Sequence, residues 1–169
     1  MNFNQFDYQC MASALQLARQ GLNSTHPNPR VGCVIARDDQ VVASGWHKKA
    51  GEAHAEIHAL REAGGKAEGG TAYVTLEPCS HSGRTPPCAV ALIEAKISRV
   101  VCAIEDPNPE VSGTGIARLR QAGIEVQSGL MAEQAEALNA GFLTRMRKGR
   151  PLVRIKLAQS IDGHDRRCP

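Results

Sequence analysis

The stretch TLEPCSHSGRTPPC, residues 75–88, places Cys79 and Cys88 at the two ends of a polar loop, each directly after a proline. The β-rich run TAYVTL (71–76) leads into this loop, and a run of helix formers follows it from about residue 87 to residue 95. The pattern is typical of a strand that ends in a loop and continues into a helix. Since α/β folds usually build their sites on such loops, we expect both thiols at the rim of a sheet.

Short strands and helices alternate along the rest of the chain as well. The expected elements, in chain order, are a helix at 5–20, a hairpin of strands at 31–37 and 40–46, a helix at 52–64, the strand at 71–76, the helix at 87–95, a strand at 99–104, a helix at 115–122, a strand at 124–127, a helix at 131–147 and a last strand at 152–158. Strands that alternate with helices favour parallel pairing, and the hairpin adds an antiparallel edge. We therefore predict an α/β fold with a mixed, mostly parallel sheet and helices on both faces.

Length and composition set limits on the function. A chain of 169 residues suffices for one domain with a real core. A net charge of +3 with one Trp, two Tyr and three Phe offers little basic surface and few rings for stacking bases, so we expect no nucleic-acid partner. No apolar run approaches the length of a membrane span, and six cysteines without regular spacing or an apolar leader favour a reducing compartment. We expect a cytoplasmic protein with no membrane contact.

A metal site is indicated by His54 and Glu56 in the segment HAE, upstream of Cys79 and Cys88. One imidazole and two thiolates suit zinc, and three protein ligands leave a fourth tetrahedral position for water, as in catalytic zinc sites. Glu56 is the candidate proton carrier beside that water. The residues thus predict one Zn²⁺ per chain, held for catalysis.

Other interpretations of these residues stay open at this point. The two cysteines could be core thiols or a redox pair, and a fourth ligand, His58 or His81, would make the zinc structural. His54 and His58 have the spacing of a metalloprotease pair, although Ala55 stands where that motif has Glu. The remaining cysteines in apolar elements are predicted to be small core residues: Cys10, Cys33 and Cys102.

At these residues the chain resembles a known family. H-x-E followed by P-C and a second cysteine resembles the zinc-dependent cytidine deaminase superfamily, whose usual signature has two residues between the cysteines where this chain has eight. The segments that carry a more specific resemblance are THPNPRVGCVI (25–35), GEAHAEIHAL (51–60), TLEPCSHSGRTPPC (75–88) and EDPNPEVSGTGI (105–116). They resemble the deaminase domain of the bifunctional riboflavin biosynthesis deaminase/reductase, over roughly residues 5–157. The resemblance implies a three-layer α/β/α cytidine deaminase-like fold.

The resemblance also implies a reaction. It is the hydrolytic deamination of 2,5-diamino-6-ribosylamino-4(3H)-pyrimidinone 5′-phosphate to 5-amino-6-ribosylaminouracil 5′-phosphate in riboflavin biosynthesis. His54, Cys79 and Cys88 would hold the zinc, and Glu56 would move protons. The alternatives are a deaminase of other nucleosides or of tRNA, which would favour the short cysteine spacing, and a truncated zinc domain without catalysis.

Contacts to the small phosphorylated pyrimidine carry over from the same resemblance. Asn28, Asp106 and Asn108 match polar positions that face the nucleoside. His47, His81 and Arg84 are candidates for further polar and phosphate contacts, and an arginine can bind a phosphate through two hydrogen bonds.

The C-terminal segment suggests a second unit. RIKLAQSIDG (154–163) resembles the entry into the family's pyridine-nucleotide-dependent reductase domain, whereas the following HDRRCP does not resemble its continuation. We therefore expect a zinc-dependent deaminase domain at 1–148 and a truncated start of a reductase domain, or a tail, at 149–169. NADPH binding and hydride transfer are not expected of this chain. A homo-oligomer is compatible with the family resemblance.

Overall fold

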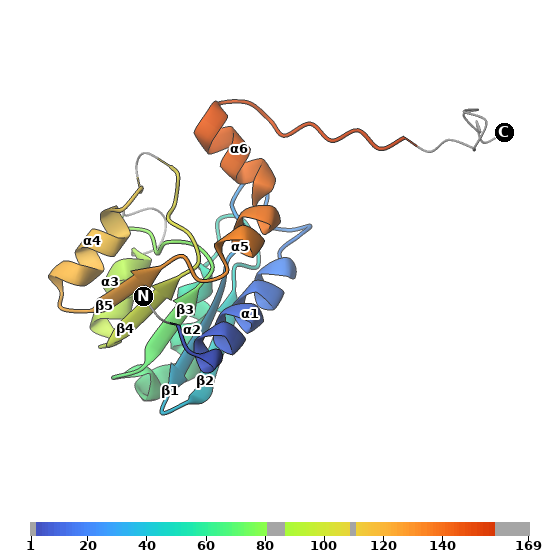
Figure 1. Cartoon of the computed structure of the whole chain (residues 1–169). Helices are drawn as coiled ribbons and strands as arrows, with labels where there is room; N and C mark the ends of the chain where they lie inside the picture. Colours follow the sequence, from blue (N-terminus) through green and yellow to red (C-terminus); the bar gives the residue numbers. More distant parts are fainter. Residues whose placement is uncertain (1–2, 81–86, 109–110, 158–169) are drawn as a thin grey trace.

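The computed structural model describes residues 3–80, 87–108 and 111–157. Its centre is a five-stranded sheet in the order β2-β1-β3-β4-β5 (Figure 1). The strands are β1 (Gly32–Arg37), β2 (Gln40–Trp46), β3 (Thr71–Val74), β4 (Arg99–Cys102) and β5 (Glu125–Ser128). β1 pairs antiparallel with both β2 and β3, whereas β3–β4 and β4–β5 are parallel. The mixed sheet and its opening hairpin are confirmed, but parallel pairing covers only the β3–β5 half.

The hairpin turn follows from its two aspartates. Asp38 and Asp39 both have positive φ, 51° and 56°, which is the backbone that a two-residue hairpin loop requires. Aspartate tolerates this left-handed region better than most residues do. The turn therefore sets the register in which β2 returns along β1.

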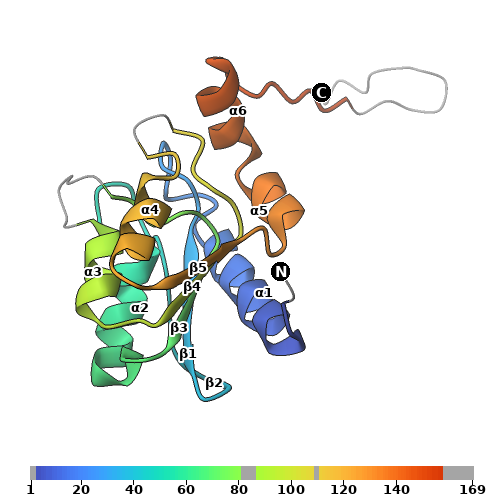
Figure 2. The same cartoon turned by 60° about the vertical axis from the view of Figure 1, so that its left-hand side comes forward.

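Helices cover both faces of the sheet. α1 (Gln5–Arg19) and α5 (Ala132–Leu138) lie on one face, and α2 (Ala55–Ala63), α3 (Cys88–Glu94) and α4 (Thr114–Gln121) lie on the other (Figure 2). The 3₁₀ turn η1 (Gly64–Ala67) follows α2, and α6 (Ala140–Lys148) extends beyond the sheet. This arrangement confirms the α/β fold with helices on both faces. None of the helices in the described ranges has the length and apolar character needed to cross a membrane.

The two cores follow from the alternation of side chains along β1. Cys33 and Ile35 pack toward the α2–α4 face, and Val34 and Ala36 pack toward α1. Every one of these four side chains is nearly inaccessible to solvent. Gly32 brings α1 close, because a Cβ on this glycine would lie 2.0 Å from the carbonyl oxygen of Ala14. The three cysteines predicted to be core residues, Cys10, Cys33 and Cys102, are indeed buried.

Two elements differ from the sequence prediction. The helix predicted at 131–147 is two helices, α5 and α6, which meet at Asn139. The buried Asn139 side chain accepts a hydrogen bond from the Arg30 backbone N–H and donates one to the Arg30 carbonyl oxygen, both at 2.8 Å. This pairing of a side chain with the backbone ties the helix junction to the segment before β1.

The strand predicted at 152–158 is wrong for the part that the structure describes. Residues 152–157 have no secondary structure and are exposed, including the apolar side chains of Leu152, Val153, Ile155 and Leu157. Alternating β-branched residues make a strand only where another strand can accept their backbone hydrogen bonds. Here the segment leaves α6 and runs away from the sheet (Figure 1).

Candidate active site

The candidate zinc ligands come from three separate segments that meet at the rim of the sheet. His54 is the N-cap of α2, Cys79 follows β3, and Cys88 is the first residue of α3. The Nδ1 atom of His54 lies 3.6 Å from the Sγ of Cys79 and 3.3 Å from the Sγ of Cys88. All three ligand atoms lie within 4.8 Å of one another.

This geometry fits a tetrahedral zinc ion. Zn–S bonds of about 2.3 Å and Zn–N bonds of about 2.0 Å, at tetrahedral angles, separate a nitrogen and a sulfur ligand by roughly 3.5 Å. The two measured N–S distances lie on either side of that value. The residues brought together by the fold therefore match both the chemistry and the spacing of a three-ligand zinc site.

The electrostatics of the cluster favour metal binding at Cys79. Hydrogen bonds from the Cys88 thiol, the His54 ring and the Cys88 backbone N–H lower the pKa of Cys79 to about 4, against the effect of burial. The hydrogen bond between His54 and Cys79 raises the pKa of His54. The hydrogen bond between Cys88 and Cys79, together with burial, raises the pKa of Cys88. A lowered pKa favours the thiolate form of Cys79, which is the form in which sulfur binds zinc.

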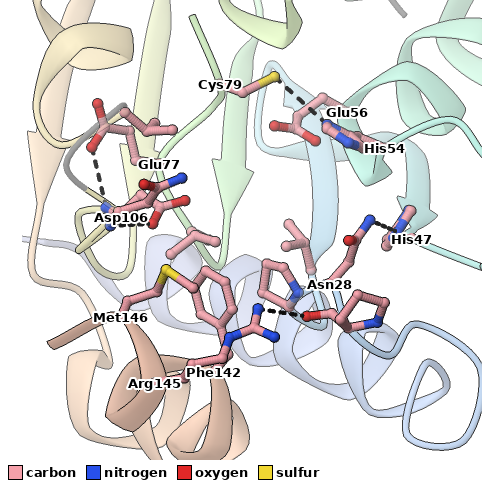
Figure 3. Close-up of a pocket in the computed structure, with 16 residues that line it drawn as sticks. Asn28, His47, His54, Glu56, Glu77, Cys79, Asp106, Phe142, Arg145 and Met146 are labelled. Atoms are coloured by element: carbon pink, nitrogen blue, oxygen red, sulfur yellow. Dashed lines mark hydrogen bonds between the residues drawn. The ribbon is translucent and has the colours of Figure 1, made fainter. Parts of the chain in front are cut away.

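Glu56 lies beside the cluster, in the first turn of α2, and is 3% exposed. Burial raises the pKa of its carboxyl group to about 7, so the group can take up or release a proton near neutral pH. Because His54 is an extended N-cap residue and not part of the helix, the two side chains both reach one cavity (Figure 3). A proton carrier and a metal site therefore share the same space.

The cavity has a volume of about 300 Å³. In Figure 3, His54, Glu56 and Cys79 lie on one side of it and side chains of α6 lie on the opposite side. The lining residues are Pro27, Asn28, Pro29, Val31, His47, His54, Glu56, Leu76, Glu77, Cys79, Asp106, Asn108, Val111, Phe142, Arg145 and Met146. Its size and its mixture of apolar and polar groups are those of a small-molecule site.

Asn28 and His47, both predicted from the sequence, form a pair in this cavity. Nδ1 of His47 lies 3.1 Å from the carbonyl oxygen of Ala53, which can only accept, so Nδ1 carries the proton. Nε2 then accepts from the Asn28 side-chain amide at 3.2 Å. Burial lowers the pKa of His47, which favours this neutral ring. Both ring nitrogens are thus engaged, and the ring fixes Asn28 with its Oδ1 as the acceptor for a ligand.

The other predicted contacts divide into two groups. Asp106 and Asn108 line the cavity, and the Asp106 carboxylate accepts a hydrogen bond from the Asn108 backbone N–H at 2.9 Å. His81 and Arg84 lie outside the described residues. His58, weighed as a ligand, is not part of the cluster found among the described residues.

Sequence reasoning missed Glu77 and the α6 side of the cavity. Glu77 is a buried carboxylate just before Pro78 and Cys79, and an acidic residue at the end of an apolar strand was the available signal. Phe142, Arg145 and Met146 carry no motif. Arg145 donates a hydrogen bond to the Pro27 carbonyl oxygen at 3.2 Å, and its guanidinium lies 5.9 Å from the centre of the Phe142 ring. Among the described lining residues, only Arg145 has a permanent positive charge.

Comparison with known proteins places these features in a family. Residues 4–104 match the model of the cytidine and deoxycytidylate deaminase zinc-binding region. The riboflavin biosynthesis protein RibD of Escherichia coli is 60% identical over 157 residues, which are 93% of this chain and 43% of that protein. The diaminohydroxyphosphoribosylamino-pyrimidine deaminase of Buchnera aphidicola is 52% identical over 141 residues, 83% of this chain and 96% of that protein.

A solved structure agrees with these matches. Acinetobacter baumannii RibD superimposes with a TM-score of 0.92 at 55% identity, over 94% of this chain and 45% of that one. The chain thus spans less than half the length of the RibD proteins that it resembles, and nearly the whole length of the Buchnera deaminase.

Proposed function

The chain belongs to the family that contains the cytidine and deoxycytidylate deaminase zinc-binding region, and from that premise we propose that it is a zinc-dependent deaminase of riboflavin biosynthesis. The proposed substrate is 2,5-diamino-6-ribosylamino-4(3H)-pyrimidinone 5′-phosphate, and the product is 5-amino-6-ribosylaminouracil 5′-phosphate. One observation carries the proposal: His54, Cys79 and Cys88 converge in one cluster, and His54 and Cys79 line the same cavity as the buried carboxyl of Glu56. The Buchnera relative, named for this deamination, supports the choice of substrate.

His54, Cys79 and Cys88 would hold one zinc ion per chain, in agreement with the family model and the ligand spacing. Bound zinc acts as a Lewis acid that lowers the pKa of a water molecule toward about 7. The three protein ligands leave a coordination position for that water.

Glu56 moves the protons. In the net reaction, water adds to the ring carbon that bears the amine, the carbon–nitrogen bond breaks, and ammonia leaves. The Glu56 carboxylate takes a proton from the attacking water and delivers protons to the ring nitrogen and to the departing amine. A pKa near 7 suits a group that must do both, since neither protonation state is strongly favoured at neutral pH.

The other residues that line the cavity would bind the substrate. Asn28 offers Oδ1 to a donor of the nucleoside, with His47 as the residue that orients it. Asp106 and Asn108 face the same space. Arg145 offers a cation for the 5′-phosphate from the α6 side, as a further candidate beside His81 and Arg84.

The proposal also covers the cellular compartment and the partners of the enzyme. We propose that the enzyme acts in the cytoplasm without a nucleic-acid partner, and a homo-oligomer is compatible with the family resemblance. The free thiols of Cys10, Cys33 and Cys102, buried in the cores, agree with a reducing compartment. The division at residues 148 and 149, and the lack of NADPH-dependent hydride transfer, stay predictions from the sequence.

The test is ammonia release by the zinc-loaded chain from the diaminopyrimidinone ribosyl phosphate, with cytidine as a second substrate. Glu56→Gln keeps the size of the side chain and should lower kcat by about 10²–10⁴ with zinc content unchanged. The control Glu52→Gln makes the same chemical change on an exposed residue and should leave the rate unaltered. No release from folded, zinc-replete protein would refute the proposal, and preferential release from cytidine would favour a nucleoside deaminase.

A further inference from the structure

A second buried carboxylate near the zinc ligands receives four backbone hydrogen bonds. Glu77, 4% exposed, lies between β3 and Cys79. Its Oε2 accepts from the N–H groups of Asp106 at 3.1 Å and Gly113 at 3.0 Å. Its Oε1 accepts from those of Gly115 at 2.9 Å and Ile116 at 3.1 Å. All four donors belong to the segment that follows β4. The Glu77 side chain thus binds backbone that lies 29 to 39 residues further along the chain.

This carboxylate caps α4 from another part of the chain. The first N–H groups of a helix have no intrahelical partner, and an N-cap side chain usually accepts from the second or third of them. The N-cap of α4 is Gly113, which has no side chain to do so. Glu77 accepts from the second and third residues of α4, Gly115 and Ile116, and places negative charge at the positive end of the helix dipole.

Close packing also holds the start of α4 against the segment 77–80. A Cβ on Gly115 would lie 1.9 Å from the carbonyl oxygen of Pro78, so α4 rests directly on the backbone next to Cys79. The hydroxyl groups of Ser80 and Thr114 lie 2.6 Å apart, and Arg118 donates to the Ser80 carbonyl oxygen at 3.3 Å. The segment 77–80, which carries a zinc ligand, and the start of α4 are therefore held together by side-chain, backbone and steric contacts.

The hydrogen bonds continue from Glu77 into the wall of the cavity. The Asp106 backbone is bound to Glu77, and the Asp106 carboxylate binds the Asn108 N–H. Asp106, Asn108 and Val111 all line the cavity. Glu77 lines it too, and each of its oxygens accepts from two N–H groups, which suits it to hold the surrounding backbone in place.

We propose that Glu77 is a positioning residue that sets the distance between the cavity wall formed by Asp106, Asn108 and Val111 and the zinc ligand Cys79. The identity of the substrate in this inference rests on the proposed function. The contact between Glu77 and the segment after β4 does not depend on that function. The four N–H donors require a side chain with an acceptor at both terminal positions. In Glu77→Gln, the amide NH₂ replaces one oxygen and faces two N–H donors, whichever way the amide is turned.

The experiment compares wild type, Glu77→Gln, Glu77→Asp and the control Glu94→Gln, an exposed glutamate on α3. Amide hydrogen exchange of the zinc-loaded chain is followed by NMR at the four donors of Glu77. We expect Glu77→Gln to lose protection at two or more of these amides. We also expect KM for the ribosyl phosphate to rise about tenfold or more, with zinc content retained and a smaller change of kcat. Glu77→Asp keeps both acceptors with a shorter reach, so it should fall between wild type and Glu77→Gln.

Two results would overturn the inference. One is unchanged exchange at the four amides in Glu77→Gln. The other is a variant that unfolds more readily but whose folded form keeps the wild-type KM, since that is what a purely structural role predicts. If Glu77→Gln does not fold, Glu77→Asp with wild-type exchange and KM overturns it equally. Wild-type protein that releases no ammonia would refute the proposed function, whereas the exchange data would still decide on Glu77.

Discussion

The buried ion pair between Asp7 and Arg99 should make a large contribution to stability. Oδ1 of Asp7 accepts from Arg99 Nη1 and from the Tyr73 hydroxyl, both at 2.7 Å. Oδ2 accepts from the Asn4 N–H at 2.9 Å and from Arg99 Nη2 at 3.3 Å. Asp7 lies on α1, Tyr73 on β3 and Arg99 on β4, so the carboxylate ties the helix to two strands. Asp7→Asn keeps the size of the side chain but removes its charge and one acceptor.

The magnitude follows from burial. Removing one partner of a fully buried ion pair costs about 3–5 kcal/mol. The side chain of Asp7 is 3% exposed, but that of Arg99 is 21% exposed and also donates to Gln127 at 2.7 Å. Arg99 would thus keep a partner and some water, so we expect the lower range, about 2–3 kcal/mol for Asp7→Asn. For a domain of this size that corresponds to a melting temperature lower by roughly 5–10 °C.

The stability lost in Asp7→Asn should depend on pH. Burial alone would raise the pKa of Asp7, but hydrogen bonds from Arg99, the Asn4 backbone and Tyr73 outweigh it and lower the pKa below its usual value of 3.8. A lowered pKa in the folded state stabilises the fold above the unfolded-state value, and this stability is lost as the pH falls through the folded-state value. The difference between wild type and Asp7→Asn should be complete at neutral pH and should shrink below about pH 4.

The assay is urea denaturation followed by circular dichroism, at neutral pH and at steps down to about pH 3. Glu125→Gln is the matched control, since Glu125 lies 3.9 Å from the Arg99 Nε but is 61% exposed. An exposed pair of this kind should contribute less than about 1 kcal/mol. Equal losses in Asp7→Asn and Glu125→Gln at neutral pH would refute the reasoning, as would a difference that stays constant into acid.

Three further changes test the site and its support. Cys88→Ser should reduce bound zinc from about one ion per chain to a small fraction by metal analysis, whereas the core variant Cys10→Ala should retain it. Gly32→Ala places a Cβ 2.0 Å from the Ala14 carbonyl oxygen and should cost about 2 kcal/mol or more in urea denaturation; a neutral result would refute the close approach of α1. Arg145→Gln should raise KM about tenfold for the phosphorylated substrate but not for its dephosphorylated nucleoside, and equal effects on both would exclude a phosphate contact.

The cluster of His54, Cys79 and Cys88 could be expected because each residue belongs to a short sequence motif. His54 precedes α2 and Glu56 lies in its first turn, Cys79 follows β3, and Cys88 begins α3, so the motifs and the alternation of elements were enough to expect these residues at one rim of the sheet. The same holds for the Asp38–Asp39 hairpin turn, where two adjacent residues determine the backbone.

The features that could not be predicted depend on contacts between distant residues. The break at Asn139 falls inside a stretch with the pattern of one helix, and the Asn139 side chain pairs there with the backbone of Arg30, 109 residues earlier. The segment 152–157 has the pattern of a strand, but it extends away from the sheet in the described structure. Arg145 reaches Pro27 across 118 positions of the chain, which no motif marks.

Glu56 and Glu77 show how the environment gives different roles to two buried carboxylates of the same residue type. Glu56 is buried beside the metal ligands, and burial raises the pKa of its carboxyl group to about 7, so it can exchange protons. Glu77 receives four N–H groups, two on each oxygen, and so binds the backbone of a separate segment. Glu56 can therefore change its protonation state during turnover while Glu77 keeps the cavity wall at Asp106 in place. The separate effects expected of Glu56→Gln on kcat and of Glu77→Gln on KM follow from this division.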